Sequence, residues 1–103
     1  MYNHEEKVRV LSGAVAKLVQ RLCLSPSQVN HFFNRGKVTD MDFAAVFVNT
    51  CLQLFSLVGE DDSKTAQWLK SENRHLFNKS PIELMSTVHG LHQVEAYLHP
   101  RDY

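Results

Sequence analysis

The sequence lacks an excess of charge, since eleven Lys and Arg residues balance eleven Asp and Glu residues in a chain of 103. No net field therefore draws the chain towards nucleic acid or an anionic membrane surface. Hydrophobic residues make up 44% and charged residues 21% of the chain, which is typical of a globular protein rather than a disordered one. At this length we expect one domain with a single modest core.

Cysteine and glycine are scarce and widely spaced. Cys23 and Cys51 each lie in an apolar helical pattern, so we predict two small buried residues in a reducing compartment rather than a disulfide. The glycines at positions 13, 36, 59 and 90 are isolated, which excludes a glycine-rich phosphate-binding loop. We expect no catalytic cysteine, because the apolar surroundings of Cys51 would stabilise a thiolate poorly.

Long apolar runs are also missing. The longest uncharged run, residues 43–59, includes four polar residues and falls short of the roughly 20 apolar residues that a membrane span requires. The first six residues show neither the basic start nor the apolar core of a signal peptide. We therefore predict a cytoplasmic protein without a membrane segment.

The six histidines do not predict a metal site. His89 and His92 are three residues apart and could share a helix face, with His75 or His99 nearby in the sequence. Structural zinc sites take four thiolate or imidazole ligands at closer, paired spacings, and the sequence has no Cys-x-x-Cys pair. The acidic run at residues 60–62 falls at a predicted helix start, where the helix dipole accounts for it without catalysis. We predict no enzyme, no metal and no cofactor.

Apolar residues recur at helical spacing along most of the chain, which predicts an all-α fold. The first helix is expected over about residues 5–23. The capping sequence at residues 25–28 opens a short second helix, which is expected to stop at residues 34–36, where Gly36 can adopt a left-handed conformation. The longest helix is expected to begin at Thr39 and to end at Gly59.

Shorter helices are predicted in the second half of the chain. Asp61 or Asp62 caps a helix that runs out near residues 71–73. Leu76 and Phe77 are expected to pin the loop that follows to the core, because both side chains are apolar.

The end of the chain predicts two more helices. Residues 80–83 repeat the capping pattern, with a glutamate in the return position. Gly90 is expected to break the helix, and Leu91, Val94 and Leu98 form the apolar stripe of the last one. No strand pattern competes anywhere. We therefore predict a compact bundle of about five to six helices with a long apolar central helix.

The predicted central helix is apolar around most of its circumference over residues 43–58. One small domain cannot bury all of that surface, so we predict a homodimer through this helix. Within the single compact domain, we assign residues 1–59 to an amino-terminal helical and dimerisation region. Residues 60–103 form the second helical region of this domain.

A distinctive pattern covers the last third of the chain. It reads Trp-Leu-x-Ser-x-Asn-x-x-Leu, then Pro-x-Glu-Leu-x-x-Thr, then Gly and the final helix. The residues that make up the pattern are Trp68, Leu69, Ser71, Asn73, Leu76, Pro81, Glu83, Leu84, Thr87, Gly90, Val94 and Leu98. This pattern resembles the toxin-binding domain of the Xre/MbcA/ParS antitoxin family.

The resemblance implies a protein partner and a mode of action. Partners of this family are RES-type toxins, which consume NAD or use it to ADP-ribosylate targets. The resemblance implies an antitoxin that docks its carboxy-terminal domain on the toxin, with its tail at or near the active-site cleft, and that commonly dimerises. For such an antitoxin we predict that the loop, the last helix and the tail contact the partner, through Asn73, Arg74, His75, His92, Glu95, His99, Arg101, Asp102 and Tyr103.

Residues 18–33 are similar to the opening of a helix-turn-helix, but no recognition helix is expected at the required position. Arg21, Arg35 and Lys37 are the candidate DNA-binding residues, and they would neutralise too few phosphates for tight binding at physiological salt. Two alternatives to the antitoxin stay open. One is a transcriptional regulator with a minimal helix-turn-helix, and the other is a dimeric structural interaction module.

Overall fold

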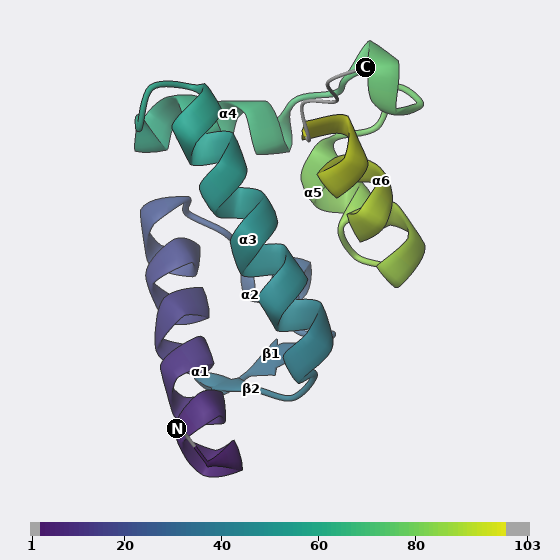
Figure 1. The fold of residues 1–103 in the computed structure, drawn as a ribbon. Coiled ribbons are helices and arrows are strands. Elements are labelled where there is room, and N and C mark those ends of the chain that lie inside the picture. The colour runs from purple at the N-terminus through teal and green to yellow at the C-terminus, as the bar shows by residue number, and fades with distance from the viewer. Residues whose placement is uncertain (1–2, 99–103) are drawn as a thin grey trace, which may run out of the picture.

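The structure, a computed structural model, describes residues 3–98. These residues form a helical bundle with one small hairpin (Figure 1). The elements are α1 (His4–Arg21), α2 (Pro26–Val29), β1 (Phe33–Asn34), β2 (Lys37–Val38), α3 (Met41–Leu57), α4 (Asp62–Lys70), the 3-10 helix η1 (Arg74–Leu76), α5 (Pro81–Leu84) and α6 (Val88–Leu98). The prediction of an all-α bundle is confirmed.

Side-chain caps start several helices where the sequence predicts them. The backbone N–H of Ser25 donates to Oε1 of Gln28 at 2.9 Å, which is the return bond of the expected capping box at α2. Oδ1 of Asp61 accepts from the N–H of Lys64 at 3.0 Å and caps α4. The cap of α3 is Asp40 rather than Thr39, because the Asp40 carboxylate accepts the N–H of Phe43 at 3.1 Å.

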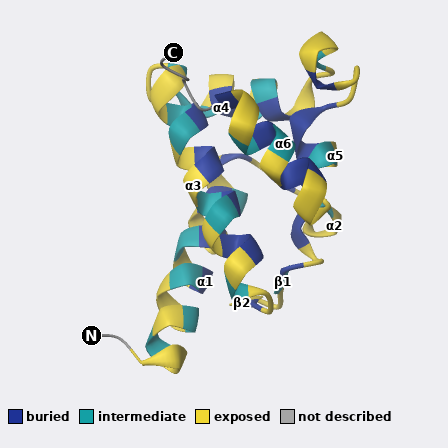
Figure 2. Ribbon diagram, turned by 45° about the vertical axis from the view of Figure 1, so that its right-hand side comes forward, coloured by how far each residue is buried: buried dark blue, intermediate teal, exposed yellow. Residues whose placement is uncertain are grey.

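Helix α3 contacts α1, α4 and α6, and its buried side carries much of the core (Figures 1 and 2). Phe47 and Leu54 on this side are almost fully buried, together with Val15 of α1 and Val94 of α6. The opposite side is exposed, and Leu52 there keeps half of its surface in solvent. With 17 residues, α3 is one residue shorter than α1, so the prediction that it is the longest helix is wrong.

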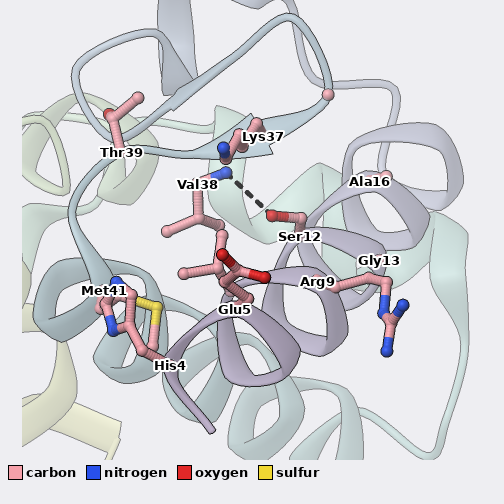
Figure 3. Close-up of a pocket in the computed structure, with 12 residues that line it drawn as sticks. His4, Glu5, Arg9, Ser12, Gly13, Ala16, Lys37, Val38, Thr39 and Met41 are labelled. Carbon is pink, nitrogen blue, oxygen red and sulfur yellow. Dashed lines mark hydrogen bonds between the residues drawn. The ribbon is translucent and has the colours of Figure 1, made fainter.

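The expectation that no strand forms is wrong at residues 33–38, which form an antiparallel hairpin. Arg35 and Gly36 both have positive φ, of 53° and 76°, which is the conformation of a two-residue type I′ turn. The N–H of Val38 donates to the buried hydroxyl of Ser12 at 2.9 Å, so α1 covers the outer edge of β2 (Figure 3). The short helix α2 therefore ends at Val29, before the predicted stop.

The two cysteines have different surroundings. Cys51 is 1% exposed, as predicted, whereas Cys23 is exposed and follows the end of α1 with a φ of +53°. The N–H of Leu24 donates to the carbonyl of Val19 at 3.0 Å, which is the 6→1 bond of a Schellman cap. The helical periodicity does not reveal that Cys23 is the left-handed residue of this cap, a position that glycine usually fills.

Replacing Cys23 with glycine is expected to raise the free energy of unfolding by about 0.5–1 kcal/mol, because glycine has no Cβ to clash in the left-handed conformation. Urea unfolding of the reduced protein measures this change. Cys23→Ala is the matched control, since it removes the thiol but keeps the Cβ. Equal stability of the glycine and alanine variants would show that backbone conformation at this position costs nothing.

The glycine of the last helix also differs from its prediction. Helix α6 runs from Val88 to Leu98 without interruption, so Gly90 does not break it. The break precedes α6, between Leu84 and Val88. The hydroxyl of Thr87 accepts the N–H of Gly90 at 3.0 Å and thereby caps the start of α6.

Candidate partner-binding surface

The loop between α4 and α5 is organised around Asn73. Its side-chain Oδ1 accepts the N–H of His75 at 2.9 Å, and its carbonyl accepts the N–H groups of Leu76 and Asn78, each at 3.0 Å. Its own N–H donates to the carbonyl of Lys79 at 3.0 Å, which closes the loop with an isolated β-bridge. A single residue therefore satisfies most of the backbone hydrogen bonds of this loop, so the loop has a defined shape.

Two apolar residues of this loop have opposite environments. Leu76 is 3% exposed and fastens the loop to the core, as the sequence predicts. Phe77 is 66% exposed, so the prediction that it also pins the loop is wrong. The physical reason is local: φ at Phe77 is +61°, in the left-handed region, and the chain reverses there.

Three rings from separate elements stack beside this loop. The ring of Tyr97 on α6 lies between Trp68 of α4 and His75 of η1, with centroid distances of 6.2 and 6.1 Å and interplanar angles of 17° and 20°. Trp68 is partly buried against the core, whereas Tyr97 is 46% exposed and His75 is exposed. We call Trp68, His75 and Tyr97 the aromatic stack. In this stack, Trp68 packs against the core, while Tyr97 and His75 present ring surface that a partner can reach.

The side of α6 that carries Tyr97 continues as a polar surface. His89 and Gln93 precede Tyr97 at intervals of four residues and therefore share its side of the helix. Both line a shallow groove of about 340 Å³ with Lys79 and Glu83, so this side of α6 lies beside the end of the loop and α5. The groove and the Tyr97 ring of the aromatic stack lie on the same side of α6, and together they form the candidate surface.

Residues 53–103 match the family model described as the antitoxin Xre/MbcA/ParS C-terminal toxin-binding domain. The carboxy-terminal half of this chain belongs to that antitoxin family. No curated protein matches the chain significantly. The toxin-binding domain begins inside α3 and contains the complete aromatic stack, the Asn73 loop and the groove beside α6.

Several residues of the family pattern support the scaffold of the toxin-binding domain. Asn73 organises the loop, Thr87 caps α6, and Leu69 and Leu76 are buried in the core. Gly90 is buried and lies against the last residue of α5. The pattern therefore identifies the fold of the domain, while exposed residues such as His75 and Tyr97 lie between its positions.

The structure brings together only part of the predicted contact set. Asn73, Arg74 and His75 lie in the loop, and His75 joins the aromatic stack. His92 and Glu95 instead pair with each other, with Nδ1 and Oε1 3.2 Å apart. At about 100° per residue, His92 lies about 140° around α6 from Tyr97, on a different side of the helix. The remaining predicted residues, His99, Arg101, Asp102 and Tyr103, lie outside the described residues.

Tyr97 was not among the predicted contact residues. The helical stripe of Leu91, Val94 and Leu98 identifies the buried side of α6, and Tyr97 lies off this stripe. A large exposed aromatic residue off an apolar stripe is the sequence signal that could have indicated it. Only the tertiary structure shows which exposed side of α6 lies beside the Asn73 loop.

The candidate DNA-binding residues do not form one site. Arg21 makes two bonds to Asp62 of α4, with Nη2 2.8 Å and Nε 3.1 Å from its carboxylate oxygens, and its guanidinium carbon lies 4.8 Å from the ring centroid of Phe55. The bonds to Asp62 and its negative charge raise the pKa of Arg21. Arg21 therefore fastens α1 to the toxin-binding domain, about 13 Å along the helix axis from the turn that contacts the hairpin.

The other two basic candidates lie at the opposite end of α1. Arg35 occupies the hairpin turn, and Lys37 lines a groove of about 890 Å³ between α1 and the hairpin, with Glu5 and Arg9 (Figure 3). The hairpin stands where a helix-turn-helix has its recognition helix, so no helix is available there to enter a major groove.

Residues 3–98 contain neither a metal-binding cluster nor a single membrane-spanning helix. Within this range, no group of three or more His, Cys, Asp and Glu side chains is placed to hold a metal ion. No single helix in the same range is long and apolar enough to cross a membrane.

Proposed function

We propose that this protein is a cytoplasmic antitoxin that binds a RES-type toxin and neutralises it by covering its active-site cleft. Membership of residues 53–103 in the toxin-binding family supports the antitoxin role. The aromatic stack supports a binding mode, because three rings from α4, η1 and α6 meet at an accessible surface. Aromatic residues are enriched among the residues that contribute most to protein–protein binding.

The proposed contact surface is centred on Tyr97 and His75 and includes Asn73 and Arg74 of the loop. His92 and Glu95 belong to its far edge, on another side of α6. The tail residues His99, Arg101, Asp102 and Tyr103 follow α6 directly in the sequence and belong to the same proposal. Neutralisation then requires no reaction by the antitoxin, since a bound protein domain blocks access of NAD to the toxin.

We also propose that the protein forms a homodimer through the outer side of α3. Leu52 on this side is 50% exposed, and Leu57 in the last turn of the helix is 60% exposed. Burying exposed leucine side chains contributes about 25 cal/mol for each Å² of apolar surface removed from water. A second copy placed against α3 would leave the aromatic stack accessible to the toxin, because the stack lies on α4, η1 and α6.

Replacing Tyr97 with alanine is expected to weaken the complex with the toxin about 30-fold or more, because it removes the central ring of the stack. Growth rescue on coexpression with the cognate toxin gene, and titration calorimetry of the purified pair, measure this loss. Tyr97→Phe keeps the ring and is expected to keep most of the affinity.

Val88→Ala is a second control, since Val88 is 58% exposed at the other end of α6. Thermal unfolding of each variant separates lost contacts from lost folding. Wild-type protein that neither binds the toxin nor restores growth would disprove the antitoxin proposal. Wild-type binding that Tyr97→Ala leaves unchanged would disprove only the placement of the surface.

A further inference from the structure

Phe77 is the most exposed of the large hydrophobic residues in the described part of the chain, with 66% of its surface in solvent. Its backbone has a φ of +61°, and that of Asn78 has a φ of +59°. A bulky aromatic residue in the left-handed region is an outlier, whereas glycine and asparagine are ordinary there. The fold gains its core contact from Leu76, so folding alone does not explain a phenylalanine at position 77.

The loop holds this ring in a defined place. Hydrogen bonds from Leu76 and Asn78 to the carbonyl of Asn73, and from Asn73 to Lys79, fix the backbone on both sides of Phe77. The loop projects from the end of the bundle beside the carboxy-terminal end of α6 (Figure 1). A partner that receives the ring therefore bears little of the entropy cost of ordering the loop.

The charges around Phe77 are mainly positive. Arg74 and Lys79 lie three residues before and two residues after it, and neither makes an ion pair with another described residue. Glu72 is the one acidic residue between positions 71 and 79. A complementary partner surface would carry carboxylates around an apolar pocket, because opposite charges at an interface rim favour encounter.

We infer that Phe77 is an anchor residue, whose ring enters an apolar pocket of the toxin bordered by aspartate or glutamate side chains. The inference rests on the proposed function, since the toxin is the occupant. It extends the contact surface from the aromatic stack to the tip of the loop. Backbone strain retained beneath an exposed ring is consistent with a residue kept for binding.

Phe77→Gly and Phe77→Asn separate binding from folding. Both substitutions relieve the left-handed backbone, so we expect a Tm equal to or higher than that of the wild-type protein. We expect affinity for the cognate toxin to fall about 30-fold or more, measured by titration calorimetry. A structural role would instead lower Tm, with affinity falling only as far as folding does, and that result would overturn the inference.

The matched control is Val88→Ala, which truncates another exposed apolar residue of the same domain and is expected to bind the toxin normally. Wild-type affinity in Phe77→Gly, with the wild-type pair still binding, would overturn the anchor but not the antitoxin function. Absence of binding by the wild-type protein would disprove the function itself. A change in the protein's own sedimentation on Phe77→Gly, with toxin affinity retained, would identify a second copy as the occupant and overturn the inference.

The rate of association with the toxin tests whether carboxylates border the pocket that receives Phe77. Replacing Arg74 and Lys79 together by glutamate is expected to slow association with the toxin at least tenfold at low salt, with the difference shrinking as salt is added. Lys64→Glu, an exposed charge reversal on α4, is the control for a general charge effect. An unchanged association rate in the double variant would overturn the acidic pocket.

Discussion

Replacing Gly90 with alanine is expected to lower the free energy of unfolding by about 3 kcal/mol. A Cβ at this position would lie 1.9 Å from the carbonyl oxygen of Leu84 and 2.7 Å from its carbonyl carbon. Both atoms belong to the backbone at the end of α5, so no side-chain rotation relieves the overlap. α5 and α6 must then move apart, and Val94, which is fully buried, loses part of its packing.

Gly13→Ala is the matched control for this prediction. Gly13 lies in the middle of α1, and a Cβ there would have no atom within 4 Å. Alanine is a better helix former than glycine, so this variant is expected to gain up to about 1 kcal/mol. Urea unfolding of both variants measures the contrast. A loss below about 1 kcal/mol in Gly90→Ala would show that the two helices separate more easily than their contact indicates.

The same substitution also tests how the scaffold positions the candidate surface. The contact between Gly90 and Leu84 sets the distance between α5 and α6 and hence the position of Tyr97 relative to the loop. Gly90→Ala is therefore expected to weaken toxin binding even where the variant remains folded, because the aromatic stack loses its alignment. The fluorescence of Trp68, the one tryptophan in the sequence, measures this alignment, because the Tyr97 ring lies against it.

Above pH 9, the protein is expected to lose stability relative to a Cys51→Ala variant by about 1.4 kcal/mol for each pH unit. Burial raises the pKa of the Cys51 thiol from 9.0 to about 12, because desolvation penalises the thiolate. Between pH 9.0 and about pH 12, the unfolded chain releases the thiol proton while the folded protein retains it. The unfolded state is then favoured as pH rises, whereas below pH 9 both states are protonated and the stability is fully present.

Urea unfolding of the reduced wild-type and Cys51→Ala proteins from pH 8 to pH 11 measures this effect. All other side chains are common to the two proteins, so their contributions cancel in the difference between the two curves. A difference that does not change with pH would show that the Cys51 thiol ionises equally in both states. Alkylation gives an independent readout, since exposed Cys23 is expected to react in the folded protein and Cys51 only after unfolding.

Local signals explain which parts of the fold were predictable. The helical stripes and the caps at Ser25 and Asp61 act within a few residues, so the order of the helices followed from the sequence. The hairpin did not, because strands of two residues are too short to show an alternating pattern. Arg35 occupies a turn position that requires positive φ and is usually filled by asparagine or aspartate, so the turn signal was also weak.

The candidate surface was predictable only where local sequence patterns mark its residues. Asn73 and His75 belong to a loop that the family pattern marks, so the sequence indicated the segment that carries them. Tyr97 and the pair His92 and Glu95 lie on the same helix, and the apolar stripe shows only which side of it is buried. Which exposed side of α6 faces the loop depends on how the helix packs against α3 and α5.

By itself, the sequence determined the helical class of this protein, the main helices in their order and the presence of a toxin-binding domain. These properties depend on periodicity, caps and a pattern of core and turn residues, each acting over short distances along the chain. Only the tertiary structure decided that Tyr97 lies between Trp68 and His75, that Arg21 binds Asp62, and that Phe77 faces solvent. These contacts join elements far apart in the sequence, or depend on the chain reversing at a left-handed residue, and no local periodicity contains that information.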